Sequence, residues 1–352
     1  MRSSSPPTKS PHHNLNYRRA PAGGVPERSE GGSFDARGVV SFPSPSERDN
    51  LSRVRKRPPP GFAGAPPSGG RNTLADTGYF GPDSITWAVN QEITVLFGGA
   101  RALLMHAAHP LIAAGARQTS MYQRDSWARL LRTLMLQSTM TFGTKQEADE
   151  AAERINRLHF RINGIDPVTG ERYDAIDHDL LLWVHAALEV SSIYFFERTV
   201  RHLTTEERDR YHHENLVAAE LMLLPRERVP TRYADLERYV ESVITSDRLL
   251  RTDVSDNVAD LIRKGPVPAT LRPIWAFIRF AAFGTLHPSL QMLYGVKWSN
   301  ARDRWLRANL WLLGKVRPFL PRRFRFIGPA RWAYERLEGK HNLTLAEAGA
   351  RR

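Results

Sequence analysis

The feature that most constrains this chain is a run from Asp177 to Leu203 that is apolar on nearly every face. A helix that is apolar all round must be covered by other elements, so we expect it at the centre of the fold. No run alternates apolar and polar residues as a half-buried strand would, and no repeat of fixed period occurs. The sequence therefore predicts an all-α fold, with a single multi-helix globular domain.

Caps and apolar periodicity divide the rest of the domain into further helices. Asp83 or Ser84 can cap the first, and the pair Gly98-Gly99 is expected to interrupt it. Thr204 stands three residues before Glu207, which is the capping-box pattern that opens a helix. The other expected elements are helices at 101–109, 112–121, 126–142, 145–163 and 231–247, and a turn or short hairpin at 166–170.

The N-terminal segment differs from the rest in composition. Residues 1–78 hold 12 of the 24 prolines and few large apolar side chains. Such a segment cannot bury enough apolar surface to offset its chain entropy. We predict a disordered Pro/Gly/Arg-rich tail at 1–78, a helical domain at 79–340 and a short tail at 341–352.

The excess of basic residues sits at the two ends of the chain. Of a formal net charge of +13, residues 1–75 carry +7 and residues 297–336 carry +9. Basic helices at 297–336 suit peripheral contact with an anionic membrane, although a solvated surface without a partner explains them equally well. The aromatic residues there fit helix packing, so no specific nucleic acid is expected.

The absence of cysteine and of long apolar runs excludes several kinds of cofactor site and membrane segment. The chain has no cysteine, which excludes disulfides, thiolate-ligated haem, covalent c-type haem and cysteine-bound iron–sulfur clusters. Met1 is not followed by an apolar stretch of the secretory kind, and nowhere do 18 apolar residues run uninterrupted. We expect a cytoplasmic protein, with membrane association left open.

Two residues of the expected helix 126–142 carry polar groups on one face. Arg129 and Thr133 are four apart and therefore neighbours on the helix surface. A guanidinium on an apolar face needs an anionic partner, because burying it alone is costly. A carboxylate or haem propionate would serve. An intramolecular salt bridge at the rim of the helix is the alternative.

Histidines in apolar surroundings are the candidate metal ligands. His159 follows a stripe with Ile155, Leu158 and Ile162, which predicts an inward imidazole. Such a ring can bind iron through one nitrogen while the other donates a hydrogen bond, or it can be a packed core histidine. The same alternatives hold for His185. Two further histidines, His106 and His109, lie three apart on one face.

One other helical enzyme class competes. His178-Asp179 resembles the paired ligands of metal-dependent phosphohydrolases, which would need further His and Asp ligands elsewhere. A di-iron bundle needs paired Glu-x-x-His elements, and only Asp209-x-x-His212 comes near that pattern.

An ordered set of short motifs resembles a known family. The motifs run Gly99-Ala-Arg-Ala-Leu-Leu-Met-His-Ala-Ala-His-Pro110, Ala113-Ala-Gly115, Arg129-Leu-Leu-Arg-Thr133, Phe142-Gly-Thr144, Leu158-His159, Tyr173-Asp-Ala175 and Leu182-Trp-Val-His185. In this order they resemble the rubber-oxygenase catalytic domain, which latex clearing proteins share with the mycophenolic-acid-pathway oxygenase B. The likeness covers roughly residues 80–295.

The resemblance implies a globin-like helical core that holds one haem b and uses dioxygen on a small apolar substrate. By the same resemblance, His159 would be the axial iron ligand, and Arg129 and Thr133 would be catalytic residues beside the haem. His185 would be a supporting histidine, and His109 a further candidate for cofactor binding.

This chain departs from the latex clearing proteins at one position of the motif. Those proteins carry a lysine just before the threonine, where this chain has Arg132, whose guanidinium does not readily give up its proton. Rubber-degrading members are also typically secreted, whereas no secretory signal is visible here, so both points argue against rubber cleavage and favour an intracellular substrate. The function we expect is that of a haem b-dependent oxygenase acting on an apolar, isoprenoid or lipid-like substrate. The alternatives are a non-catalytic haem- or lipid-binding helical protein and, less favoured, the metal-dependent phosphohydrolase.

Overall fold

The structure is a computed structural model that describes residues 76–119, 126–265, 267–340 and 345, with the backbone alone at 126–133. All of these residues belong to one compact unit. The tail expected at 1–78 falls almost wholly outside the described residues. Asp76 is described and accepts a hydrogen bond from the backbone N–H of Lys145 (3.3 Å). Leu345 is buried, with its backbone N–H on Glu147 Oε1 (2.7 Å).

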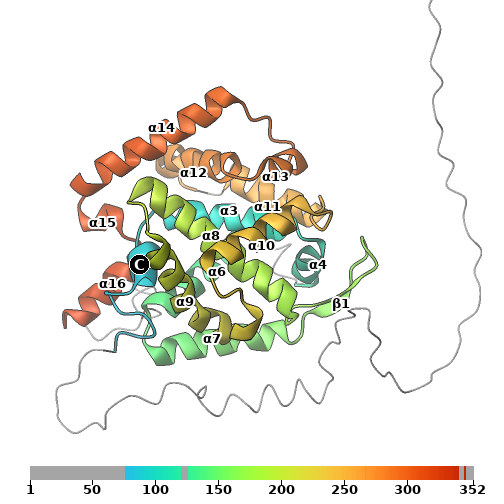
Figure 1. The fold of residues 1–352 in the computed structure, drawn as a ribbon, viewed down its shortest axis with the longest axis horizontal. Coiled ribbons are helices and arrows are strands. Elements are labelled where there is room, and N and C mark those ends of the chain that lie inside the picture. Colours follow the sequence, from blue (N-terminus) through green and yellow to red (C-terminus); the bar gives the residue numbers. More distant parts are fainter. Residues whose placement is uncertain (1–75, 120–125, 266, 341–344, 346–352) are drawn as a thin grey trace, which may run out of the picture. The chain divides into compact units, whose positions relative to one another are not determined.

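The described part of the chain is all-α, as predicted, with two short strands (Figure 1). The α-helices are α2 (Ile85–Asn90), α3 (Val95–Ala107), α4 (Pro110–Gln118), α6 (Ser126–Phe142), α7 (Lys145–His159), α8 (His178–Thr199), α9 (Thr205–Leu221), α10 (Tyr233–Thr245), α11 (Asp253–Lys264), α12 (Arg272–Gly284), α13 (Pro288–Leu293), α14 (Asn300–Val316), α15 (Arg322–Arg325) and α16 (Gly328–Leu337). Three 3₁₀ turns join them: η1 (Arg226–Arg228), η2 (Ala269–Leu271) and η3 (Arg317–Phe319).

Helices α3 and α8 form the centre of the fold (Figure 1). The prediction of a central apolar helix is confirmed: α8 buries most of its length, and Asp177 caps its start. The helices approach closely at Gly98, where an added Cβ would lie 2.9 Å from the carbonyl oxygen of Ser191. The expected interruption at Gly98-Gly99 is wrong, because α3 runs straight through both glycines. Gly98 serves close helix packing.

The break expected at the glycines falls instead between α2 and α3. Here the chain forms a bridge between Glu92 and Phe326, and the backbone N–H of Ile93 donates to Arg325 (2.7 Å). The buried Glu92 carboxylate accepts from Nε of Arg317 (2.9 Å). Residues 317–327 are therefore fastened to the domain across a long sequence separation, which no local pattern reveals.

Other helices cover the central pair on several sides. Helix α12 packs on α3, and α14 packs on both α8 and α12 as an outer layer (Figure 1). Helices α9 and α10 pack on α8. Helices α2, α6 and α16 enclose a second small core, where the ring of Trp87 meets those of Phe142 (4.9 Å) and Tyr334 (5.4 Å) edge-on.

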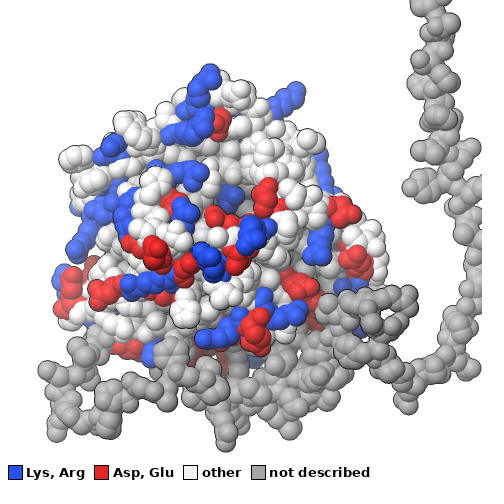
Figure 2. Space-filling view, in the orientation of Figure 1, with Lys and Arg blue, Asp and Glu red and all other residues white. Residues whose placement is uncertain are grey.

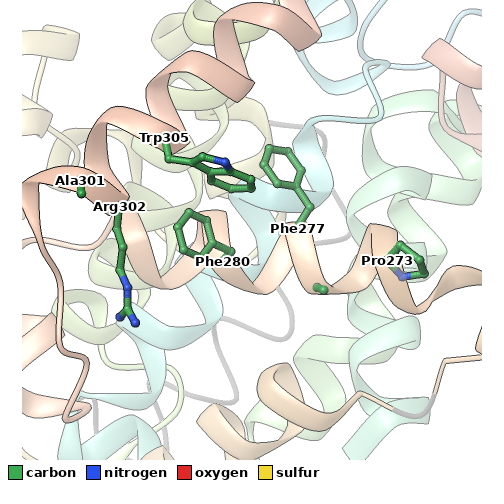
Figure 3. A pocket seen from close by; sticks show the side chains of 7 residues that line it. Pro273, Phe277, Phe280, Ala301, Arg302 and Trp305 are labelled. Atoms are coloured by element: carbon green, nitrogen blue, oxygen red, sulfur yellow. The ribbon is translucent and has the colours of Figure 1, made fainter.

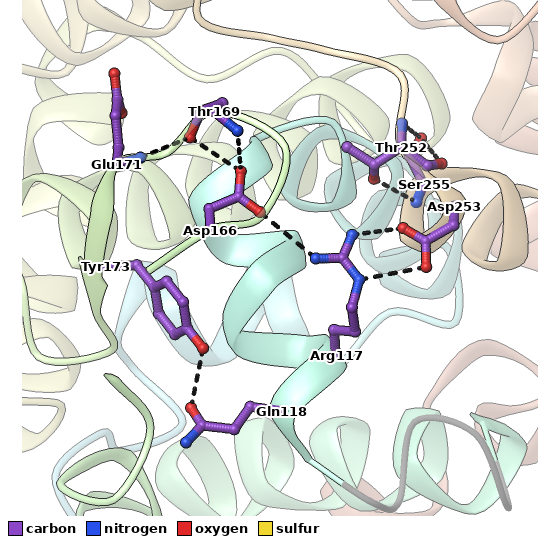
Figure 4. A network of polar contacts seen from close by, with 9 residues as sticks. All are labelled: Arg117, Gln118, Asp166, Thr169, Glu171, Tyr173, Thr252, Asp253 and Ser255. Carbon is purple, nitrogen blue, oxygen red and sulfur yellow. Dashed lines mark hydrogen bonds and ion pairs between the residues drawn. The ribbon is translucent and has the colours of Figure 1, made fainter. Parts of the chain in front are cut away.

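The predicted turn at 166–170 is a hairpin between β1 (Asn163–Ile165) and β2 (Arg172–Asp174). Figure 4 shows how it is tied down: Arg117 of α4 contacts Asp166 at the turn (3.5 Å) and donates through Nε to Asp253 of α11 (3.3 Å). The hydroxyl of Tyr173 donates to Gln118 (3.2 Å). The hairpin joins the end of α7 to the start of α8, so this network fixes the segment that follows His159.

One described helix, α8, is long and apolar enough to cross a membrane, and 72% of its most apolar window is buried inside the fold. Helices α3 and α4 are long and apolar enough to cross a membrane only if they are counted together as one span, yet the chain bends by 95° between them. Among the described residues, these features match core helices at least as well as membrane spans.

Candidate active site

Helices α6 and α7 form a helical hairpin that carries three of the predicted site residues. Gly143 and Thr144 alone separate the two helices, which pack on each other. Arg129 lies 15 residues before Thr144 and His159 lies 15 residues after it. Since both helices rise equally per residue, Arg129 and His159 are about equally far along their helices from the connection, and Thr133 lies one turn closer to it.

Local sequence explains why the hairpin turns where it does. The hydroxyl of Thr144 accepts from the backbone N–H of Glu147 (3.1 Å), and the Glu147 carboxylate accepts from the N–H of Thr144 (2.8 Å). This capping box starts α7 at a fixed residue. Gly143 gives the close approach that the turn needs, because an added Cβ would lie 2.6 Å from the carbonyl oxygen of Thr139.

The buried face of α7 differs from the predicted stripe. Ala148, Ala152 and Asn156 are buried, whereas Leu158 is 46% exposed, so its expected inward orientation is wrong. His159 is the last residue of the helix and is half-buried at the border of that face. The side chains of Arg129 and Thr133 lie outside the described residues, so their predicted contacts stay predictions.

His185 belongs to a buried chain of acidic and basic groups. Its Nε2 lies 2.7 Å from Glu189 Oε1, one helical turn further along α8. The other carboxylate oxygen of Glu189 lies 2.8 Å from Nδ1 of His212 on α9. Nε2 of His212 donates to the carbonyl oxygen of Pro230 (2.7 Å). Glu189 and His212 are 3% and 1% exposed as side chains, so the pair is shielded from water.

The geometry favours a charged pair in this buried network. Both ring nitrogens of His212 face acceptor groups, an arrangement that favours the doubly protonated imidazolium form. Burial is the largest single effect and opposes this charge, but the hydrogen bond to Glu189, the Glu189 charge and the hydrogen bond to Pro230 together outweigh it and raise the pKa of His212. Burial likewise favours a neutral Glu189, yet His185 and His212 together lower the pKa of its carboxyl. The negative charge of Glu189 thus lies against the imidazole of His185, the residue expected to support the site.

Sequence reasoning did not identify Glu189 or the role of His212. The available signal was Glu189 itself, an acid in a helix that is otherwise apolar and central. A buried carboxylate needs a cationic or hydrogen-bonding partner, and a histidine one turn away at position 185 could have indicated one.

The two histidines at the end of α3 are held in their neutral form. Nε2 of His106 lies 3.1 Å from the carbonyl oxygen of Val184, and burial lowers the pKa of His106 to about 4 despite this bond. His109 caps α4, and burial together with the nearby Arg248 charge lowers the pKa of His109 to about 4. Nδ1 of His109 is buried without a hydrogen-bond partner in the described part of the chain. A neutral imidazole with such a nitrogen is chemically suited to bind a metal.

The first motif of the sequence also contains a buried cation. Arg101 of α3 is 9% exposed and donates to Ser191 Oγ (2.8 Å) and to the carbonyl oxygen of Thr285 (3.1 Å). Its guanidinium lies 5.1 Å from the ring centroid of Tyr194. Burial lowers the pKa of Arg101. These contacts join α3, α8 and the end of α12, a structural role within the core.

The phosphohydrolase pattern gains no further ligand among the described residues. His178 and Asp179 open α8, and Asp179 pairs with Arg228 at the surface (3.4 Å). The described residues contain no group of three or more His, Asp or Glu that could hold a metal ion. A haem needs fewer protein ligands, because the porphyrin supplies four of the iron ligands and one histidine can supply the fifth.

A helical domain with a half-buried histidine at the end of a helical hairpin is compatible with a cofactor-dependent redox enzyme. Comparison with protein families gives the class directly. The family model described as "ER-bound oxygenase mpaB/B'/Rubber oxygenase, catalytic domain" matches residues 86–315, and the chain belongs to this family. The family's name indicates an oxygenase, and hence an oxidoreductase. No curated protein and no solved structure gives a significant match.

Proposed function

We propose that this protein is a haem b-dependent oxygenase that uses dioxygen on an apolar, isoprenoid or lipid-like substrate. The observation that supports the proposal is membership of the oxygenase family, together with the α6–α7 hairpin, in which Arg129 and His159 are each 15 residues from Thr144. The two residue types fit a haem, because an imidazole nitrogen can bind the iron and a guanidinium can pair with a propionate.

In this proposal the protein's own residues bind and orient. His159 would hold the iron, Arg129 would pair with a propionate, and Thr133 would offer a hydroxyl on the same face of α6. His185, fixed by Glu189, would stand as a second histidine for the site. Bound haem supplies the activation of dioxygen, and the surrounding apolar side chains would exclude water and orient the substrate.

The test is an absorption spectrum of the full-length protein produced with added haem, compared with that of His159→Ala. A Soret band that the variant loses or shifts supports both the haem and its ligand. His213→Ala is the matched control, because His213 is an exposed histidine of α9. A Soret band unchanged in His159→Ala but lost in His185→Ala or His109→Ala would reassign the ligand.

A second pair of variants tests the propionate partner. Arg129→Gln should weaken haem retention on a desalting column, whereas Arg154→Gln, which alters an exposed arginine of α7, should not. Oxygen uptake with squalene as an isoprenoid alkene probe then separates an oxygenase from a haem carrier. A folded protein that binds no haem would refute the proposal and favour lipid binding without turnover.

A further inference from the structure

Helix α14 carries an apolar stripe that faces away from the protein. Ala301, Trp305, Ala308, Leu312 and Val316 are spaced four, three, four and four apart, so they lie on one face. All five are exposed, with Trp305 and Leu312 each at 52%. The helix buries a different face. Trp305 at the edge of this second apolar face meets Phe280 of α12, and the five residues nevertheless remain exposed.

The buried face of α14 rests on Leu306 and Leu310, each 2% exposed, which pack toward α8 and α12. At Gly314 the helix comes so close to the end of α8 that an added Cβ would lie 3.2 Å from the carbonyl oxygen of Thr199. The helix is therefore fixed mainly by its inner face, and the exposed stripe contributes to the packing chiefly through Trp305, which contacts α12.

A groove continues this stripe toward α12. Figure 3 shows Trp305 of α14 over Phe277 and Phe280 of α12, with Pro273 at one end and Arg302 at the other. The ring of Trp305 meets Phe280 edge-on at 5.0 Å. The groove has a cavity volume of about 560 Å³ and an apolar floor, large enough to take part of an acyl chain.

Further apolar residues extend the surface beyond the C-terminal end of α14. Phe319 of η3 is 87% exposed. Within α14 itself, Trp311 is 62% exposed. Phe324 of α15 is 54% exposed. Exposed aromatic side chains on neighbouring elements form an apolar patch, and such patches on a protein surface commonly mark a site of contact with another protein or a membrane.

Basic residues surround this surface. The segment 297–325 holds nine Lys or Arg and one acid, Asp303, which pairs with Arg307 (2.7 Å). In Figure 2 the side chains over α14 are mostly blue and white, with little red. The ammonium of Lys315 lies 5.6 Å from the ring centroid of Trp311, so cations and aromatic rings alternate over the same patch.

We propose that the outer face of α14, with the α12–α14 groove, η3 and α15, docks on a membrane surface rich in anionic phospholipid. Exposed Trp and Phe suit the boundary between headgroups and acyl chains, and the flanking Lys and Arg reach lipid phosphates. Charge complementarity selects this occupant. A second copy of the chain would bring the same cations together, and residues 1–75 are themselves basic at +7. The proposal is independent of haem.

The test is co-sedimentation of the full-length protein with vesicles of phosphatidylcholine alone or mixed with phosphatidylserine. The unmodified protein should bind the mixed vesicles, less so as salt rises. Trp311→Ser/Phe319→Ser should lose most of this binding. Its control is Ile165→Ser/Met292→Ser, which removes two apolar residues that are 71% and 80% exposed on other elements and should leave binding unchanged.

A charge-reversal variant tests whether the basic residues contribute to binding of anionic lipid. Arg322→Glu/Arg323→Glu should weaken binding to the mixed vesicles by about fivefold or more for each cation removed. Arg226→Glu/Arg228→Glu on η1 is the control and should bind as the unmodified protein does. Failure of the unmodified protein to bind mixed vesicles would overturn the proposal, and so would equal binding by all variants. A dimer that Trp311→Ser/Phe319→Ser dissociates would assign the face to self-association instead.

Discussion

The buried pair of Glu189 and His212 makes a sharp prediction about stability. Glu189→Gln keeps the size of the side chain but removes its charge, and leaves the His212 imidazolium buried without a counter-charge. Removing one partner of a buried ion pair costs about 3–5 kcal/mol of unfolding free energy. For a folded part of this size, each kcal/mol lowers the melting temperature by about 2–4 °C, so a fall of roughly 6–20 °C is expected.

The pH dependence of this loss follows from the two pKa shifts. The raised pKa of His212 gives stability that is fully present below its ordinary value of 6.5 and is lost as pH rises through the folded value. The lowered pKa of Glu189 gives stability that is fully present above its ordinary value of 4.5 and is lost as pH falls through the folded value. The pair therefore contributes most between pH 4.5 and 6.5.

The assay is urea unfolding of the unmodified protein and Glu189→Gln in that window and at clearly alkaline pH. The difference between the two proteins should shrink at the higher pH, because His212 can then lose its proton. Subtracting the unfolding free energy of Glu189→Gln from that of the unmodified protein at each pH removes the contribution of the other histidines, which titrate in both proteins. Glu153→Gln is the control: it breaks a surface pair with Arg157 (3.3 Å) and should cost well under 1 kcal/mol. A difference that is small, or that grows with pH, would refute the charge assignment.

Three further predictions concern the core. Gly98→Ala should destabilise the fold by about 1–3 kcal/mol because the added Cβ meets the backbone of Ser191 on α8, whereas Gly99→Ala should be neutral or stabilising because nothing lies within 4 Å of its added Cβ. Thermal unfolding of the two variants measures the difference, and equal effects would contradict the close approach of α3 and α8 at Gly98. Trp87→Ala should cost about 3–5 kcal/mol in urea unfolding, because its ring is fully buried between Phe142 and Tyr334. Burial lowers the pKa of His106 from 6.5 to about 4, so the unfolded chain takes up the proton first and the free energy of unfolding falls as pH drops through that interval. His106→Gln should remove about 3 kcal/mol of this fall, and an unchanged dependence of the unfolding free energy on acidic pH would count against a neutral His106.

Several elements could be predicted from the sequence because their causes are local. Thr144 and Thr204 form the capping boxes that start α7 and α9, and both lie within three residues of their partners. The apolar composition of α8 required burial on every side, whatever packed against it. The family could likewise be recognised from ordered motifs, since these are properties of the chain itself.

The tertiary structure decided what depends on residues far apart in the chain. Gly98-Gly99 looked like a helix break, but the approach of α8 makes Gly98 a packing residue, and the break falls where residues 325–327 bind residues 91–93. Leu158 had the spacing of a core residue, yet it is exposed, because α7 buries the face of Ala148, Ala152 and Asn156 instead. The partners of Glu189 and the outward face of α14 were equally hidden. Local sequence sets where helices start and how apolar they are, whereas the direction each face takes depends on which other helix packs against it.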